Sequence, residues 1–302
     1  MRAEYEPQRE RMSESPGFIA ALDQSGGSAP LALARYGIDI DPAGGPGADE
    51  STMLDMIHEM RVRIMTSPSF TADHVLGAIL FAGTLDRTVD GLPTAEYLWK
   101  RNGIVPFVKI DVGLAEARDG VRLMLPIPGL DATLGRAVEA GVFGTKMRSV
   151  IDGGDASAMR TLVDQQFSVA RRVLAAGLIP IIEPEVSIEH AAKVDAEHVL
   201  RDLLIAALDR VATPHQVMLK LTLPTVDGAY QSLIDHPRVL RVAALSGGYS
   251  RNDATERLSR NPGMIASFSR ALTEGLRAEQ SDAEFDAALA TSIATIYAAS
   301  IT

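Results

Sequence analysis

Eight short apolar runs, each ending in polar or charged residues, alternate along the chain with longer segments of helical character. Most runs are apolar throughout, which suits strands covered on both faces, as in a parallel sheet. Alternation of strands and helices in this way is typical of α/β folds. The runs span 18–24, 76–82, 105–111, 143–149, 179–185, 217–223, 239–246 and 264–269.

The segments between the runs have helical periodicity. Residues 156–177 are the clearest case, with apolar side chains recurring on one side and Gly177 placed to stop the helix. Residues 189–212 and 251–259 also predict helices. Eight strand–helix units extend along the chain of 302 residues, a usual size for a (β/α)8 TIM barrel. A doubly wound open sheet is the rival, but no glycine-rich dinucleotide motif follows the first run.

Three stretches lie outside the repeat. Residues 1–16 predict a charged lead-in helix over the closed end of the barrel, and residues 41–47 a surface loop. Residues 276–300 predict an amphipathic C-terminal helix, and no linker divides the chain, so we expect a single domain over 1–302. The apolar stripe of the last helix consists of Phe285, Leu289, Ile293, Ile296 and Tyr297.

Composition limits the partners and the compartment. A net charge of −10 argues against nucleic acid or an anionic membrane surface as a partner, although small anions remain suitable ligands. The absence of cysteine excludes disulfides, thiolate chemistry and cysteine-ligated metals. The N-terminus has no apolar signal-peptide core, and the longest apolar run, 173–182, is far too short to cross a bilayer. We therefore expect a cytoplasmic protein.

Charged residues gather at the ends of the runs. In a (β/α)8 barrel the reacting groups come from the C-terminal ends of several strands. A single charge there is often a solvated loop residue, but charges at six of the eight runs are harder to explain in this way, because unpaired charges beside buried strands are costly. The charges are Asp23, Lys109, Asp111, Lys146, Arg148, Glu183, Glu185, Lys220 and Arg270.

Lys220 lies in the middle of the apolar run 217–223. It could reach the rim of the sheet and keep its ammonium group in water. It could instead be desolvated, so that a neutral amine attacks a carbonyl and forms a Schiff base. Because an unperturbed lysine is neutral in only about one molecule in 2,500 at pH 7, the second role requires burial or a nearby cation.

Ser246 ends the seventh run and is followed by Gly247 and Gly248. They could form an ordinary turn, or the glycines could let backbone N–H groups approach a phosphate, with Arg270 on the next and last strand adding positive charge. A second Ser-Gly-Gly sequence precedes Ser28. Two such turns and several cations would suit a ligand with a phosphate at each end.

These residues suggest a mechanism that needs no metal and no cofactor. Lys220 attacks the ketone of an open-chain phosphosugar, and Lys146 keeps it partly neutral by like-charge repulsion. Glu183 or Glu185 shuttles protons as the carbinolamine loses water. Asp23 then removes the hydroxyl proton whose loss breaks the adjacent carbon–carbon bond.

The sequence strongly resembles the class I fructose-1,6-bisphosphate aldolases, and most closely their short bacterial branch. The motifs that carry the resemblance run in family order over nearly the full length of the chain. They are AALDQSGGS at 20–28, FGTKMRS at 143–149, IIEPE at 181–185, MLKL at 218–221, LSGGYSR at 245–251 and ASFSRA at 266–271.

The resemblance implies roles for these residues. Lys220 would be the Schiff-base lysine and Glu183 the acid/base for dehydration, with Glu185 beside it, while Asp23 and Lys146 would serve carbon–carbon cleavage. The phosphate of the ketone half would be held by Ser246, Gly247, Gly248 and Arg270. The sugar and the distal phosphate would be held by Ser28, Lys109 and Arg148.

Two features depart from the animal-type enzymes of the family. Gln24 stands where those enzymes carry a glutamate, so any role of that carboxylate is absent here. Those enzymes also end in a mobile tyrosine implicated in protonating the enamine, whereas this chain ends AASIT and Tyr297 is expected to pack on the last helix. The group that protonates the enamine is therefore open.

The predicted activity is reversible cleavage of fructose 1,6-bisphosphate to dihydroxyacetone phosphate and glyceraldehyde 3-phosphate, a lyase reaction of glycolysis. One alternative is a metal-dependent barrel enzyme with Asp23, Glu183 and Glu185 as ligands, which EDTA would inactivate. This alternative is less favoured because no histidine lies near a strand end: all six fall in expected helices or loops. Another is a non-catalytic sugar-phosphate binder on the same scaffold. The outer helices of such a barrel also allow a homo-oligomer.

Overall fold

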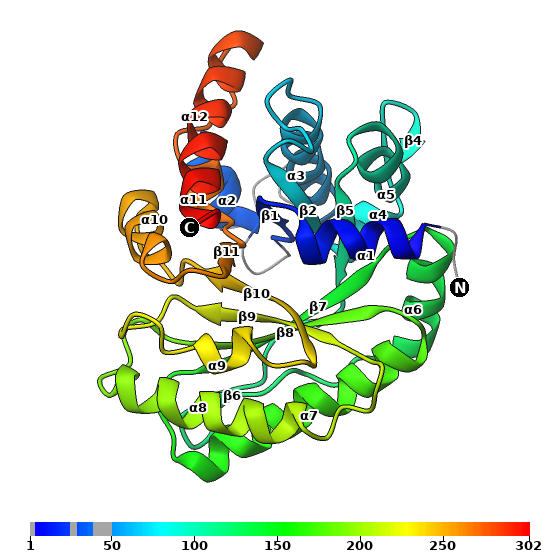
Figure 1. Cartoon of the computed structure of the whole chain (residues 1–302). Coiled ribbons are helices and arrows are strands. Elements are labelled where there is room, and N and C mark those ends of the chain that lie inside the picture. Colours follow the sequence, from blue (N-terminus) through cyan, green and yellow to red (C-terminus); the bar gives the residue numbers. More distant parts are fainter. Residues whose placement is uncertain (1–3, 25–28, 39–49) are drawn as a thin grey trace.

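The computed structural model describes residues 4–24, 29–38 and 50–302. Eight parallel strands follow one another in sequence order around a single sheet (Figure 1). Each of the eight apolar runs forms one of these strands, so the predicted (β/α)8 barrel is confirmed. The strands are β1 (Phe18–Leu22), β2 (Val75–Leu80), β5 (Val105–Lys109), β7 (Gly144–Ile151), β8 (Ile179–Val186), β9 (Val217–Thr222), β10 (Val239–Leu245) and β11 (Met264–Ala266).

The first and last strands meet. The N–H of Ala21 in β1 donates a 3.2 Å hydrogen bond to the carbonyl of Phe268, just after β11. This contact brings the two ends of the sheet together, so the barrel is nearly closed. Three short strands form antiparallel pairs outside the barrel order. β6 (Val121–Arg122) pairs with β7, and β3 (Thr88–Val89) pairs with β4 (Leu92–Pro93).

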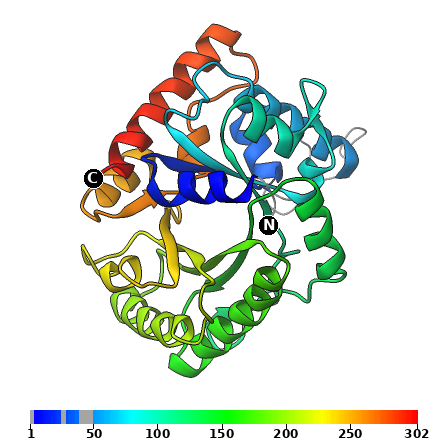
Figure 2. The same cartoon turned by 45° about the vertical axis from the view of Figure 1, so that its right-hand side comes forward.

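Helices surround the sheet (Figure 2). Those that follow the strands are α2 (Ala29–Arg35), α3 (Glu50–Met65), α4 (Ala82–Leu85), α5 (Thr94–Glu96), the π-helix η1 (Tyr97–Arg101), α6 (Leu130–Glu139), α7 (Ala156–Ala175), α8 (Lys193–Leu208), α9 (Gln231–Ile234), α10 (Arg251–Ser259) and α11 (Arg270–Thr273). The predicted helices 156–177 and 251–259 are confirmed. Gly177, with φ +77°, follows the end of the first of them.

The helix predicted over 189–212 is shorter than expected. It is α8, which begins at Lys193 and ends at Leu208. Before it, Nδ1 of His190 accepts a 2.9 Å hydrogen bond from the N–H of Ala192, and this local turn replaces the first helical turn. After α8, the N–H of Val211 donates a hydrogen bond to the carbonyl of Leu208, which forms a turn.

Side chains alternate between the inside of the barrel and the layer under the helices, as the pleat of a strand requires. The lower interior is filled by apolar side chains, among them Ile19, Phe107, Ile181 and Met218. Met12 of α1 (Tyr5–Glu14) joins this cluster, because α1 lies across the N-terminal end of the barrel (Figure 1). The closed end is therefore apolar, and polar groups can enter only from the other end.

The C-terminal helix α12 spans Asp282–Ser300 and so begins later than the predicted 276. The Ser281 hydroxyl accepts from the N–H of Glu284, and the Glu284 carboxylate accepts from the N–H of Ser281; this capping box sets the start of the helix. Four of the five predicted stripe residues are buried, and Tyr297, half-buried, stacks edge-on against His74. Residues 41–47 lie outside the described part of the chain.

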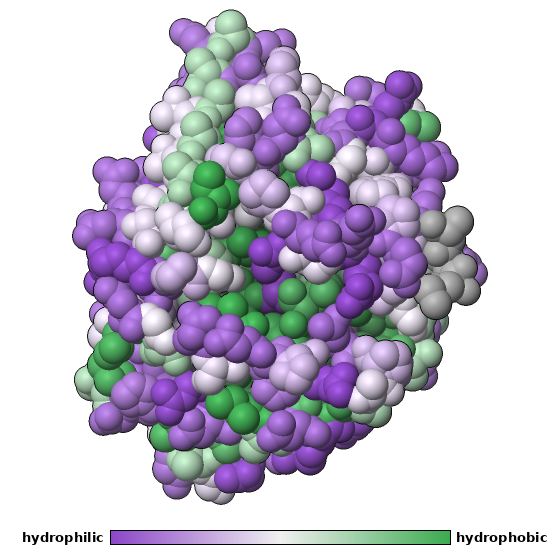
Figure 3. Space-filling view, in the orientation of Figure 1, coloured by the Kyte–Doolittle hydropathy of each residue, from purple (hydrophilic) through white to green (hydrophobic). Residues whose placement is uncertain are grey.

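On the face of the protein shown in Figure 3, polar and charged residues surround an area of apolar residues near the centre. Within the described ranges no helix combines the length and the apolar character that crossing a membrane requires. The predicted compartment, the cytoplasm, stays a prediction.

Candidate active site

A cavity of about 980 Å³ opens at the C-terminal ends of the strands. Its walls carry residues from the last part of each of the eight strands or from just after it. The charges predicted to gather at the mouth of the barrel therefore do so. The predicted residues that line it are Asp23, Lys109, Asp111, Lys146, Arg148, Glu183, Glu185, Lys220, Ser246, Gly247 and Arg270.

The period of two along each strand explains why these side chains point inward. In β8, Ile181 belongs to the apolar interior, so Glu183 and Glu185, two and four residues later, point to the same side. In β9, Met218 and Lys220 are related in the same way. Both strands thus place their first charge directly above the apolar layer.

Four of these side chains form one ion-pair network. Nζ of Lys146 lies 2.7 Å from Oδ2 of Asp23 and 2.7 Å from Oε2 of Glu183. The other oxygen of Glu183, Oε1, lies 3.0 Å from Nζ of Lys220. Lys220 is only 4 % exposed, so it does not reach the solvated rim of the sheet. Of the two interpretations of Lys220, the structure supports the buried lysine.

The network keeps its carboxylates ionised. Burial raises the pKa of Asp23, but the ammonium groups of Lys146 and Lys220 outweigh it and hold that pKa well below its usual range. The pKa of Glu183 is lowered by the same balance, in which both lysines outweigh burial. Burial lowers the pKa of Lys146, but Asp23 and Glu183 raise it above the ordinary value. Lys146 is therefore a fixed cation at neutral pH.

Two further pairs border this network. Nζ of Lys109 lies 2.9 Å from Oδ1 of Asp111, and Nε of Arg148 lies 2.5 Å from Oε2 of Glu185. Oδ2 of Asp111 also accepts the backbone N–H of Arg148, so this carboxylate ties β5 to β7. Asp111 marks a strand end in the sequence, but nothing there shows that it would pair with Lys109.

The Ser246-Gly247-Gly248 segment turns directly after β10. Gly247 and Gly248 have φ of +61° and +125°, which disfavour any residue with a Cβ. A Cβ on Gly248 would lie 3.6 Å from Nη2 of Arg270, so the turn and the guanidinium are adjacent. The prediction that Arg270 lies on the last strand is wrong: β11 ends at Ala266, and Arg270 begins α11.

Some predicted residues fall elsewhere. Ser28 lies outside the described residues, and Gly248 is not among the residues that line the cavity. Gln24 does line it, and its Nε2 donates a 2.8 Å hydrogen bond to Oγ of Ser269. The amide thus binds a neighbouring loop where a glutamate would add another negative charge beside Asp23.

Sequence reasoning missed two buried side chains near the network. Arg61 of α3 donates to Oγ1 of Thr84 and to the carbonyl of Gln24, and burial lowers its pKa to about 10. In the sequence it resembles a solvated helix residue. Ser267 lines the cavity, and its buried Oγ has no hydrogen-bond partner in the described part of the chain. Its position one residue after β11 could have identified it, because residues that follow the strands line the mouth of the barrel.

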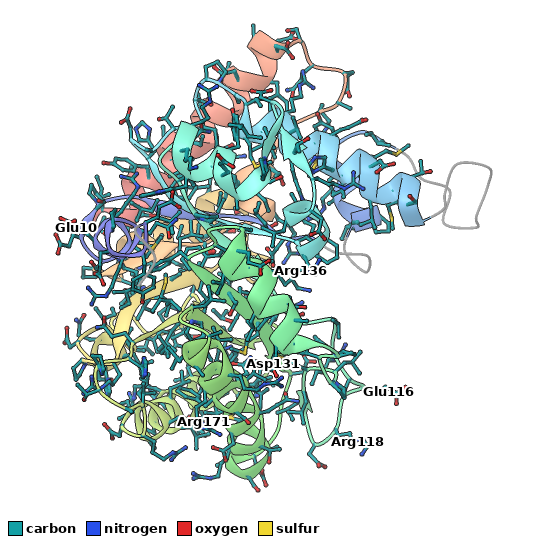
Figure 4. The ribbon with its side chains drawn as sticks, turned by 90° about the vertical axis from the view of Figure 1, so that its right-hand side faces the viewer. Glu10, Glu116, Arg118, Asp131, Arg136 and Arg171 are labelled. Atoms are coloured by element: carbon teal, nitrogen blue, oxygen red, sulfur yellow. The ribbon has the colours of Figure 1, made fainter. Side chains whose placement is uncertain are left out.

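Exposed charges behave differently. Glu116, Arg118 and Arg171 point outward into solvent at the surface formed by α6, α7 and the connection before β6 (Figure 4). None of them lines the cavity. Charge alone does not distinguish such residues from the buried network, whereas a place on the inward face of a strand does.

The residues do not favour a metal centre. Across residues 4–24, 29–38 and 50–302, no three His, Cys, Asp or Glu side chains are grouped so that they could hold a metal ion. Asp23 and Glu183, two of the proposed ligands, are instead both paired with Lys146. All six histidines lie in helices or loops, as predicted.

Fold and site together define a (β/α)8 barrel enzyme built around a buried lysine that is paired with a carboxylate. The family model described as fructose-bisphosphate aldolase class-I matches residues 55–229. The chain belongs to the class I fructose-bisphosphate aldolase family, whose members are lyases.

Two relatives are similar in sequence to this chain over almost the whole of their length. A protein of Synechocystis sp. named fructose-bisphosphate aldolase class 1 is 55% identical over 98% of this chain and 97% of the relative. A protein of the same name from Porphyromonas gingivalis is 51% identical over 97% of this chain and 98% of the relative. The structure of the aldolase from Plasmodium falciparum is similar in fold, with a TM-score of 0.74, 19% identity and coverage of 99% and 96% of the two chains.

Proposed function

We propose that this aldolase cleaves fructose 1,6-bisphosphate reversibly through a Schiff base on Lys220. The reaction begins when Lys220 loses its proton to Glu183, whose Oε1 is 3.0 Å away and ionised. The neutral amine attacks C2 of the open-chain ketose and forms a carbinolamine. Glu183 returns the proton to the departing hydroxyl, and the loss of water leaves a protonated imine.

Asp23 acts in the second half. Its carboxylate accepts the proton of the C4 hydroxyl, and the C3–C4 bond breaks as the electron pair moves into the iminium. Glyceraldehyde 3-phosphate leaves, and the remaining enamine is protonated at C3 and hydrolysed to dihydroxyacetone phosphate. Lys146, protonated between Asp23 and Glu183, stabilises the negative charge of the carboxylates and of the C4 oxygen.

The phosphates lie on opposite sides of the network in this scheme. Ser246, Gly247, Gly248 and Arg270 bind the phosphate next to the ketone. Arg148 and Lys109, with Ser28, bind the distal phosphate. Glu185, paired with Arg148, orients that arginine and lies beside Glu183 on the same face of β8.

One observation carries the proposal: a single carboxylate, that of Glu183, bridges two buried lysines. One lysine is held as a cation by two carboxylates, and the other contacts only one of them. This asymmetry separates a fixed charge from a group that can give up its proton, which a nucleophilic amine requires.

The test is reductive trapping. Borohydride added with substrate should attach a three-carbon adduct to Lys220, identified by mass spectrometry of the peptide. Lys220→Ala should lose the adduct and cleavage, and undiminished cleavage in that variant would refute the assignment. Lys100→Ala, which changes an exposed lysine, is the matched control.

The alternatives give different results. A metal-dependent lyase would lose activity in EDTA and would give no adduct. A non-catalytic binder would show heat of binding in calorimetry without turnover. A homo-oligomer associated through outer helices stays a prediction, to be tested by light scattering.

A further inference from the structure

The hydrogen-bond ladder between β8 and β9 ends beside the proposed reacting pair. β8 keeps its register with β7 from Ile179 to Val186. With β9 it pairs only at Ile181–Met218 and Ile182–Leu219. Glu183 and Lys220 are therefore the first residues beyond the last paired positions of their strands.

Pro184 explains this interruption. In a parallel strand, successive residues direct their backbone N–H and C=O groups to alternate neighbours. Ile179 and Ser187 donate to carbonyls of Phe143 and Ile151 on the β7 side, so the even-numbered residues of β8 face β9. Pro184 is one of these and has no N–H, so the next bond of the ladder cannot form.

Gln166 of α7 contacts β8 at the same point. Its side chain is completely buried, and its Nε2 donates a 3.1 Å hydrogen bond to the carbonyl of Glu183. Its Oε1 has no hydrogen-bond partner among the described residues. Beyond the interruption, the hydroxyl of Thr222 donates a 2.7 Å bond to the carbonyl of Val186 and joins the two strands again. Glu183 is thus held from β7 and from α7 at the point where the pairing between β8 and β9 has ended.

We propose that Gln166 is a positioning residue, which keeps the backbone of Glu183 in place so that its carboxylate stays between Lys146 and Lys220. The proposal rests on the proposed function, in which Glu183 exchanges protons with Lys220. That exchange needs the 3.0 Å separation, and a shift of about 1 Å can slow a catalysed step by about a hundredfold.

If the role of Gln166 were purely structural, loss of its amide would lower the thermal stability of the protein. A buried amide with one unpaired oxygen stabilises a fold poorly, because the desolvated acceptor is not compensated. A methionine of similar length would remove the unpaired oxygen together with the donor. Loss of the amide should therefore impair the reaction without reducing thermal stability.

The neighbouring residue supplies a matched control. Gln165 also holds backbone through its side-chain amide, since its Oε1 accepts the N–H of Met124 at 2.9 Å and its Nε2 donates to the carbonyl of Met124 at 3.0 Å. Both of its amide groups are paired, and neither Gln165 nor Met124 lines the cavity. Gln165→Met should lower Tm and leave kcat within about twofold.

The experiment compares Gln166→Met with Gln165→Met in Tm, kcat, KM and the pH profile of kcat. For Gln166→Met we expect kcat to fall about tenfold or more, KM to stay within about twofold, and Tm to be equal or higher. The acid limb of kcat should move to higher pH, because a displaced Glu183 loses part of its pairing with Lys146 and Lys220 while Asp23 remains nearby. Gln166→Leu is the second variant if Gln166→Met does not fold.

An unchanged kcat in Gln166→Met would overturn the proposal, and so would a parallel fall of kcat and Tm like that of a destabilised variant. These results are separable from a failure of the proposed function. If the wild-type protein gives no adduct on Lys220, the Schiff-base mechanism fails. If it gives the adduct and Gln166→Met is equally fast, only the positioning role fails.

Discussion

Nζ of Lys220 lies 3.0 Å from Oε1 of Glu183, on neighbouring strands whose backbone ladder ends one residue earlier. Lys146 contacts the other oxygen of the same carboxylate and also reaches Asp23. A continuous chain of proton donors and acceptors therefore runs from Lys220 through Glu183 and Lys146 to Asp23. Proton transfer for both halves of the reaction can take place within this chain.

Glu183→Gln should lower kcat by about a hundredfold or more, because the amide cannot accept the proton of Lys220 or return it to the leaving hydroxyl. The side chain keeps its size, so KM should change little. Steady-state kinetics and the rate of borohydride trapping measure both effects. Glu189→Gln changes an exposed carboxylate on the loop after β8 and should be neutral. Equal rates for the two variants would remove Glu183 from the mechanism.

Asp23 should make stability depend on pH in the acid range. Its pKa is lower in the folded protein than its unfolded value of about 3.9, so its contribution is fully present above that value. As the pH falls toward the folded pKa, protonation removes the contribution. The difference in Tm between wild type and Asp23→Asn should therefore shrink between about pH 6 and pH 3. A constant difference across this range would contradict the assigned direction of the pKa.

Gly248→Ala should raise KM about tenfold and lower stability by about 1–3 kcal/mol. A Cβ at φ +125° would come within 3.1 Å of Ile188 and face the guanidinium of Arg270, which displaces the turn proposed to bind phosphate. Gly228→Ala is the matched control, because its φ is +75° and a Cβ there meets nothing within 4 Å. Gly228→Ala should lower the stability of the protein and leave KM unchanged. A similar KM in both variants would separate the turn from substrate binding.

Arg148→Met should raise KM for fructose 1,6-bisphosphate about tenfold or more, because a charge-assisted contact with the distal phosphate is lost. Fructose 1-phosphate lacks that phosphate, so its KM should change less. The ratio of the two KM values is the measurement. Arg210→Met breaks an exposed pair with Asp164 and should leave the ratio unchanged. An equal rise for both substrates would place Arg148 away from the distal phosphate.

Several features of the site were predictable because they are local. The period of two along a strand puts Glu183 above Ile181 and Lys220 above Met218, and the apolar runs mark where each strand lies. The presence and inward direction of these charges follow from the chain alone. Helix ends were less predictable, since His190 and Ser281 set them through side-chain hydrogen bonds.

The sequence by itself determined the eight strands, their order and the charge carried at each strand end, because these depend on patterns within a few residues. Only the tertiary structure decided which charges pair. The sequence does not show that Lys109 pairs with Asp111, nor that Lys146 lies between Asp23 and Glu183. Such choices depend on strand register and on separations of a few ångströms between residues far apart in the chain, where Coulomb energies change steeply with distance.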